Sequence, residues 1–397
     1  MRKNVWLYYL WSFLNSFYLI AAILVVFFKS KGLNQLEIQS IQTIFQWGIF
    51  LLEIPTGVVA DKWGRKQSLA IGGLISGLGV SLYVIGRGVI WFGLCELVMA
   101  LGMALESGAN QALVYDSLKE EGGEKEFAKV VAWSRSLALG AIGLGALAGG
   151  WLAQRFSLDL VVFLNGLILL VSFGVSLLFE EPSIRGEKEV NRWKEILNQG
   201  WKLVRKNQEL RWLMIESAWL YALGYFVIWL YQPVLIKLGM KIGYFGLFHV
   251  SLILLQVGWL AVWIKVWKKL GKRKMLVWLP VLVGLGFLIM MNWMSWLGVL
   301  VWFSLSGVFG LTSRETFGVL FQEHLKSRMR ATVLSFGSML RGLVVGFLNP
   351  LVGWLVDKDL KLALGVLGVI GLVGVLVGRK MAEVVGFEPT GPKRGAD

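Results

Sequence analysis

Long apolar runs are the feature that most constrains the fold of this 397-residue chain. Hydrophobic residues make up 56% of the sequence and charged residues only 16%, whereas soluble domains carry about 25% charged residues. A helix needs about 20 mainly apolar residues to cross a bilayer. Runs of this length predict spans over residues 5–28, 36–60, 67–86, 89–116, 128–153, 158–179, 211–236, 243–267, 274–291, 296–320, 330–354 and 360–380. The predicted fold class is an all-α integral membrane protein with twelve transmembrane helices, located in the cell membrane.

The distribution of positive charge predicts how these helices are oriented. With the N-terminus in the cytoplasm, the inner segments hold 29 Lys and Arg residues and the outer links hold 8. Because cytoplasmic loops are enriched in Lys and Arg, both termini are predicted to be cytoplasmic. The net charge of +15 then reflects membrane topology and attraction to anionic lipid, and it does not indicate a nucleic-acid partner.

A longer polar segment divides the predicted helices six and six. We expect an N-terminal six-helix bundle (1–179), a cytoplasmic linker (180–210), a C-terminal six-helix bundle (211–380) and a disordered tail (381–397). Within the linker, apolar residues recur at helical spacing among Lys and Arg. This pattern is typical of an amphipathic helix on the membrane surface, and a solvated linker helix is the alternative.

The loop after the second predicted helix carries a spaced set of glycines and charges. Its residues are Gly57, Asp61, Gly64, Arg65 and Lys66. The loop resembles the signature Gly-x-x-x-Asp-Arg/Lys-x-Gly-Arg-Lys of the major facilitator superfamily. Glu53, just before it, extends the resemblance to a bacterial, efflux-like group. The resemblance implies two pseudo-symmetric bundles and a conformational latch. In that latch Asp61 faces the helix start at Arg330, where a partial positive charge favours a carboxylate.

Glycines in the fifth predicted helix bear on the direction of transport. Gly145 and Gly149 resemble in part a glycine motif of drug–proton antiporters in the same superfamily, although Ala146 stands where that motif has proline. The partial resemblance is the basis for expecting efflux. Close helix packing through the two glycines is the interpretation that we prefer.

Ionisable residues inside the predicted spans are candidates for solute contact or ion coupling, because each costs roughly 2.5–3.5 kcal/mol in hydrocarbon. In the resembled fold, helices 1, 4, 7 and 10 line the central cavity. The candidates are Glu53, Glu96, Glu106, Asp116, Arg135, Arg314, Glu315 and Arg341. A fixed structural ion pair is the alternative role for each. Glu216 is expected near the membrane interface, and His249 is expected to be a hydrogen-bonded packing residue.

Estimated depths in the membrane predict two pairs among these charges. Glu106 and Arg135 lie at comparable depths on adjacent helices when a rise of about 1.5 Å per residue is used. Glu53 is expected to approach Arg341 in at least one conformation. The alternative for Arg341 is binding of an anionic substrate.

The predicted function is secondary transport of a small solute by alternating access, with protons as a candidate coupling ion and a monomer as the expected state. The alternatives are a solute or lipid importer or flippase, or a non-transporting receptor on the same fold. Only His249 and His324 could supply imidazole, and Cys95 is the single cysteine, so a His-rich or Cys-based metal site is not expected. No phosphate-binding loop for ATP is present in the sequence. We therefore expect no enzyme activity, cofactor or metal.

Overall fold

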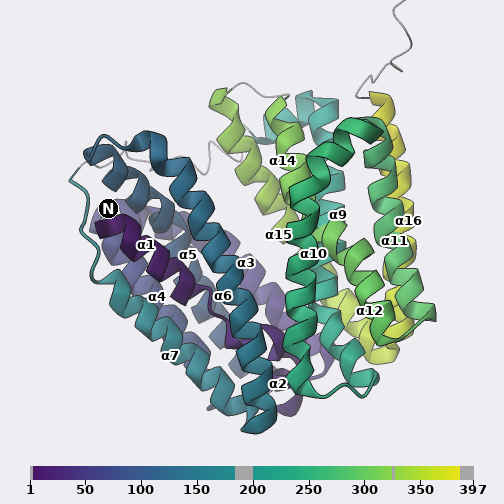
Figure 1. The fold of residues 1–397 in the computed structure, drawn as a ribbon, viewed down its shortest axis with the longest axis horizontal. Helices are drawn as coiled ribbons and strands as arrows, with labels where there is room; N and C mark the ends of the chain where they lie inside the picture. The colour runs from purple at the N-terminus through teal and green to yellow at the C-terminus, as the bar shows by residue number, and fades with distance from the viewer. Residues whose placement is uncertain (1–2, 184–199, 324–326, 385–397) are drawn as a thin grey trace, which may run out of the picture. The chain divides into compact units, whose positions relative to one another are not determined.

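The computed structural model describes residues 3–183, 200–323 and 327–384, and in these ranges the chain is helical without a strand (Figure 1). Ten helical segments in the described ranges are long and apolar enough to cross a membrane. The predicted all-α membrane class is therefore confirmed. The helices α3 (Gln35–Trp63) and α4 (Arg65–Leu82) are not among those ten, so twelve spans and cytoplasmic termini stay predictions.

The chain divides into two compact units. Unit 1 comprises Met1–Lys194, Trp229–Ile253 and Gly342–Leu360, and unit 2 comprises Glu195–Ile228, Leu254–Arg341 and Lys361–Asp397. In this division two later segments are grouped with the first part of the chain, and the bundles expected over 1–179 and 211–380 stay a prediction. The predicted division into six and six helices is a separate matter and stays a prediction.

Unit 1 is built around α3, α4 and the long helix α5 (Gly88–Glu120), which packs against both of them. Asn34 and Glu37 form a capping box at the start of α3, which fixes where that helix begins. The remaining elements of the first part of the chain are α1 (Lys3–Asn15), η1 (Leu19–Ala22), α2 (Leu24–Ser30), η2 (Glu124–Glu126), α6 (Phe127–Arg155) and α7 (Leu158–Ser176). They are joined by η3 (Ile242–Tyr244) and by parts of α9 (Gln208–Lys237), α10 (Phe245–Leu270) and α15 (Ser327–Lys358).

Unit 2 contains the other parts of α9, α10 and α15. Its further elements are α11 (Lys272–Asn292), α12 (Trp296–Trp302), η4 (Phe303–Gly307), α13 (Val308–Leu311), α14 (Ser313–Glu323) and α16 (Leu360–Val384). Glycines allow its helices to approach closely. A Cβ on Gly310 would come within 2.8 Å of the Leu220 carbonyl oxygen on α9, so no larger side chain fits there without a shift.

One predicted continuous span is broken in the structure, and this corrects the sequence prediction. The span expected over 5–28 is divided into α1, η1 and α2. The span expected over 296–320 corresponds to one candidate span over Trp296–Gly318, which contains α12, η4, α13 and part of α14. Within it η4 is a π-helical turn, and Ser304 donates its hydroxyl back to the Leu300 carbonyl. Such side-chain bonds compete with the regular helix ladder.

Two further predictions lie partly outside the described residues. The amphipathic helix expected within the linker (180–210) is described only from Gly200, where the chain is helical to Lys206. The tail expected from 381 is described only to Val384, where α16 ends, so that helix runs a little further than predicted.

Candidate functional site

The signature loop lies at the junction of α3 and α4, and we call this end of unit 1 the signature end. Gly64 separates the two helices with a φ of 108°, a conformation that favours glycine. A Cβ at Gly64 would come 2.9 Å from Oε1 of Glu181. Among the described residues, nothing lies within 4 Å of a Cβ built on Gly57, so Gly57 makes no close helix contact in this conformation.

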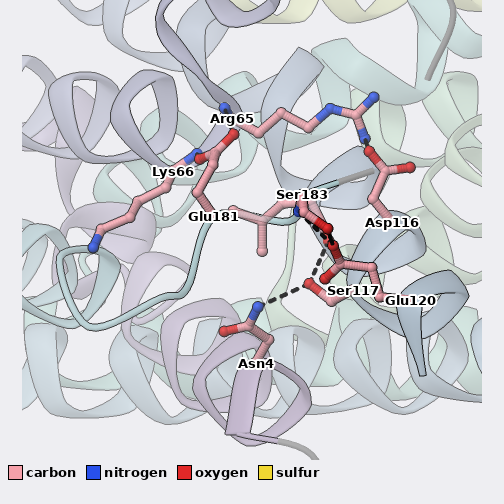
Figure 2. A network of polar contacts seen from close by, with 9 residues as sticks. Asn4, Arg65, Lys66, Asp116, Ser117, Glu120, Glu181 and Ser183 are labelled. Carbon is pink, nitrogen blue, oxygen red and sulfur yellow. Dashed lines mark hydrogen bonds and ion pairs between the residues drawn. The ribbon is translucent and has the colours of Figure 1, made fainter. Parts of the chain in front are cut away.

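Glu181 caps the start of α4 from a distant part of the chain. Its Oε1 accepts a hydrogen bond of 2.8 Å from the Arg65 backbone N–H, and its Oε2 accepts one of 2.7 Å from that of Lys66 (Figure 2). The first N–H groups of a helix lack intrahelical acceptors and carry partial positive charge. A carboxylate at this position therefore holds the chain that follows α7 against the signature loop.

The side chain of Arg65 pairs with Asp116 near the end of α5 (Figure 2). Exposed fractions of 19% for Arg65 and 5% for Asp116 show that the pair is largely shielded. Two of the predicted site residues thus meet, although their pairing was not predicted. Lys66 contributes its backbone to Glu181.

Further polar contacts tie α1 and α5 to the segment after α7 (Figure 2). Asn4 donates from Nδ2 to the Ser117 hydroxyl at 2.8 Å, and its Oδ1 accepts from the Glu180 N–H at 3.0 Å. Ser183 donates its N–H and its hydroxyl to the Glu120 carboxylate. The signature end is therefore one connected polar network built from four separate segments of the chain.

This network predicts that replacing Glu181 lowers the stability of the protein more than replacing the adjacent Glu180 does. Glu181→Ala should lower the free energy of unfolding by about 1 kcal/mol, because it removes the cap of α4. Glu180→Ala is the matched control. Its carboxylate bonds to Lys3 in an exposed pair, and such pairs contribute little. Thermal unfolding of the purified variants in detergent checks this, and equal unfolding temperatures for the two would contradict the capping role.

Three other predicted site residues have side chains outside the described part of the structure. They are Glu53, Asp61 and Arg330. The latch between Asp61 and the start of α15, and the approach of Glu53 to Arg341, therefore stay predictions.

Helix α6 packs closely against the break in the first span. A Cβ on Gly145 would come 2.9 Å from the backbone N, C and O atoms of Tyr18, and one on Gly149 would overlap the Leu19 carbonyl oxygen. These two glycines therefore serve close packing against an unwound segment, which is the interpretation preferred above.

Backbone groups at this break are satisfied by a side chain from α9. Oε1 of Gln232 accepts from the Val25 N–H at 3.0 Å, and its Nε2 donates to the Ala21 carbonyl at 3.3 Å. Irregular backbone at membrane depth is tolerated only where protein supplies such partners. Tyr231 beside it forms a hydrogen bond of 3.1 Å with Nδ1 of His249, so His249 takes part in packing as expected.

The predicted pair of Glu106 and Arg135 does not form in this structure. Glu106 is 4% exposed, and its Oε2 accepts from Nδ2 of Asn15 at 2.9 Å. Arg135 is exposed, and no ion pair found in the described ranges joins the two. The estimate of depth did not fix the helix faces, since Glu106 points toward Asn15 on α1 and toward Gly72 on α4.

Glu96 lies inside the packed helices of unit 1. It is 3% exposed, and its Oε1 accepts from Nε2 of Gln42 on α3 at 2.6 Å. The Tyr83 hydroxyl donates a further hydrogen bond to it. Three neighbouring helices thus hold Glu96, and a structural role explains its position.

Unit 2 contains a separate group of predicted residues around Arg341. This residue is 6% exposed and donates from Nη2 to the Ser338 hydroxyl at 2.8 Å. Its guanidinium carbon lies 5.7 Å from the centre of the Tyr221 ring, within the range of a cation–π interaction. Arg314 and Glu315 are exposed on α14 and interact electrostatically with Arg341.

Sequence analysis missed a contact between the start of α3 and the end of α15, which we call the α3–α15 contact. Asp357 accepts hydrogen bonds from the backbone N–H groups of Gln35 and Leu36 at 2.8 and 2.7 Å. Gly353 brings the backbones together, because its Cβ would lie 2.7 Å from the Gln35 carbonyl oxygen. The recurrence of Gly346 and Gly353 seven residues apart on one face of α15 was the available signal.

None of the described residues form a group of three or more His, Cys, Asp and Glu side chains that could hold a metal ion.

Comparisons with known proteins place these features in context. The sequence model described as Major Facilitator Superfamily matches residues 5–347. A uridine/deoxyuridine transporter from Lactococcus lactis subsp. cremoris (strain MG1363) is 32% identical over 145 residues, covering 34% of this chain and 28% of that protein. The uncharacterised transporter YxaM from Bacillus subtilis (strain 168) is 24% identical over 231 residues, covering 56% and 55%. The chain thus spans about half or less of the length of each of these relatives.

Solved structures show the same fold at low sequence identity. A mutant of the nucleoside transporter NupG superposes with a TM-score of 0.82 at 14% identity, covering 96% of this chain and all of that one. A bacterial homologue of the human lysosomal transporter Spinster gives 0.74 at 12% identity, covering 96% of each chain.

Proposed function

Because the chain belongs to the major facilitator superfamily, we propose that it is a secondary active transporter that moves a small polar solute across the cell membrane by alternating access. The match over residues 5–347 is the observation that carries this proposal. The buried polar groups of each unit and the break in the first span add support, since discontinuous helices are typical of substrate sites in transporters.

Nucleosides are the solute class that we propose. Support comes from the Lactococcus lactis relative, which is named as a uridine/deoxyuridine transporter, although the match covers only part of each chain. Asn15, Tyr18 and Glu106 at the helix break of unit 1 offer an amide, a ring and a carboxylate. Unit 2 offers the aromatic ring of Tyr221, the hydroxyl of Ser338 and the guanidinium of Arg341. Such side chains suit a base and a ribose.

The proposed topology has twelve spans with both termini in the cytoplasm. The excess of Lys and Arg in the predicted inner segments supports it. In this orientation the signature end faces the cytoplasm and the α3–α15 contact faces outward. Asp61 and Arg330 would then take part in an inner latch, while Asp357 closes an outer one.

Uptake is the direction that we propose. Efflux was expected only from the glycine motif of the fifth predicted helix, and the contacts of Gly145 and Gly149 with Tyr18 and Leu19 are a sufficient reason for glycine at both positions. Packing at a helix break serves a transporter of either direction. The name of the Lactococcus lactis relative favours a nucleoside as the solute.

Uptake by cells tests the solute class. The chain is expressed in bacteria that lack their own nucleoside uptake, and labelled uridine, deoxyuridine and a dipeptide are offered in parallel. We expect expression-dependent entry of the two nucleosides and none of the dipeptide. Entry of the dipeptide alone, or faster loss of preloaded uridine from expressing cells, would contradict the proposal.

A further inference from the structure

Three buried amide side chains on α3 and α15 have no hydrogen-bond partner in the described part of the chain. Gln35, Gln39 and Asn349 are each 0% exposed. In all three, neither the amide nitrogen nor the amide oxygen bonds to a described residue. A buried polar group without a partner costs the full desolvation of that group, and such groups are rare in folded proteins. The amides therefore call for a ligand.

A buried acid in unit 2 differs from this group. Glu216 on α9 is 1% exposed, which corrects the expectation of a place at the membrane interface. Its carboxylate also has no hydrogen-bond partner among the described residues. It is one side chain on one helix, whereas the three amides belong to two helices that contact each other.

The packing of α3 against α15 is fixed at two levels. At the first level, Asp357 accepts hydrogen bonds from the backbone N–H groups of Gln35 and Leu36. At the second, about two turns further along α3, the Thr43 hydroxyl donates to the Gly346 carbonyl at 2.9 Å. The stretch of the α3–α15 contact between these levels is therefore held from both ends.

The second level depends on a missing backbone donor. The Gly346 carbonyl would normally accept from the N–H of the residue four positions later. That residue is Pro350, which has no N–H. The Thr43 hydroxyl supplies the donor instead, so this carbonyl is satisfied without help from the amides.

Helical spacing places the amides between the two levels. Gln39 lies four residues before Thr43 on α3. Asn349 lies three residues after Gly346 and four before Gly353 on α15, and a Cβ on Gly353 would lie 2.7 Å from the backbone of α3. Residues three or four apart share one face of a helix. Gln39 and Asn349 therefore lie on the two faces that meet in the α3–α15 contact.

The chemistry of the amides selects the ligand. Each amide offers two N–H donors and one acceptor oxygen, so the three together present donors and acceptors without net charge. A cation would use only the oxygens, and an anion would use only the N–H groups. The nearby charges have partners of their own, since Asp357 binds backbone N–H groups and the Lys358 ammonium lies 3.9 Å from the Trp354 ring centre. Water both donates and accepts, and a buried molecule typically makes about three hydrogen bonds.

We propose that the α3–α15 contact binds a small group of ordered water molecules that bridge Gln35, Gln39 and Asn349. Water-mediated hydrogen bonds are nearly as favourable in enthalpy as direct ones. Helices in lipid associate through packing and hydrogen bonds, because no hydrophobic driving force acts between them. The bound waters thus join the two helices over the stretch between Asp357 and Thr43. The site goes beyond the proposed function and is independent of the solute.

Radiolytic hydroxyl labelling of the purified full-length protein tests the hydration directly. X-rays convert water into hydroxyl radicals that oxidise the side chains beside it, and mass spectrometry locates the oxidation. We expect oxidation of buried residues within 35–43 and 345–353 of the wild-type protein, and its loss in the double variant Gln39→Leu with Asn349→Leu. Thr43→Val is the matched control, because it removes a hydroxyl of the same contact and leaves the amides, so oxidation should persist. Absence of oxidation in wild type, or equal oxidation in the double variant, would overturn the proposal.

Thermal unfolding in detergent tests whether the amides share their ligand. Each single leucine variant leaves the waters short of a partner and should lower the unfolding temperature. The double variant removes both sides of the bridge and should lose less than the sum of the single losses. Strictly additive losses would contradict a shared group of waters. An unfolding temperature of wild type that differs between sodium, potassium and choline chloride would show a cation site and overturn the proposal. If a leucine variant does not fold, oxidation of the wild-type protein alone decides.

Discussion

Replacing Gly149 with valine is expected to prevent the protein from folding in the membrane. A Cβ at this position overlaps the Leu19 carbonyl oxygen and would come 3.0 Å from the Leu19 Cα. Both are backbone atoms of the break in the first span, so no side chain can rotate away. Overpacking of this kind costs about 3 kcal/mol or more, and the shift would also disturb the bonds of Gln232 to Val25 and Ala21.

The same helix supplies a matched control. Among the described residues, nothing lies within 4 Å of a Cβ on Gly140, so Gly140→Val carries the same β-branched side chain on α6 without the clash. Size-exclusion chromatography of fluorescent fusions measures the folded, monodisperse fraction of each variant. We expect Gly140→Val to resemble wild type and Gly149→Val to be lost. Equal recovery of the two would show that α6 does not approach the break as described.

Replacing Asp357 with alanine should have the second large effect, on the balance between transport conformations. Its carboxylate accepts from the N–H groups of Gln35 and Leu36, and each hydrogen bond to a charged group contributes about 1.5–3 kcal/mol. In the proposed cycle this contact must break when the outer side opens. Its loss should shift the population away from the present conformation by about tenfold or more, since 1.4 kcal/mol corresponds to a factor of ten, and should slow transport.

A neighbouring residue separates this effect from simple loss of capping. Glu37 bonds to the Asn34 N–H at the same end of α3 but does not reach α15 through that bond. Glu37→Gln should therefore weaken the local cap and leave the conformational balance close to wild type. Distances between spin labels at the ends of α3 and α15 report the balance. A shift of the same size in both variants would contradict the role of the α3–α15 contact.

The fold class could be predicted because a bilayer requires apolar runs of about 20 residues, and such runs are visible in the sequence. The break after Asn15 could not be predicted, since an apolar run looks the same in a continuous and in a broken helix. What stabilises this break is Gln232, more than two hundred positions later in the sequence. A partner at that separation is set by tertiary packing alone.

The candidate site shows the same limit. The spacing of the signature loop located Arg65 and Gly64, because a family pattern fixes their place at a helix junction. It did not locate Glu181, which lies outside the pattern and accepts hydrogen bonds from backbone N–H groups of a segment far from it in the sequence. Depth along a helix could be estimated for Glu106 and Arg135, but the direction in which each side chain points depends on helix rotation, which sequence alone left open.

Counterflow in proteoliposomes tests the central claim most directly. Vesicles that contain the purified protein are loaded with unlabelled uridine and diluted into labelled uridine at low concentration. Alternating-access transport predicts a transient accumulation of label above its equilibrium level, absent from vesicles without internal uridine. Folded wild-type protein that gives no transient accumulation with uridine or any other nucleoside would contradict the account.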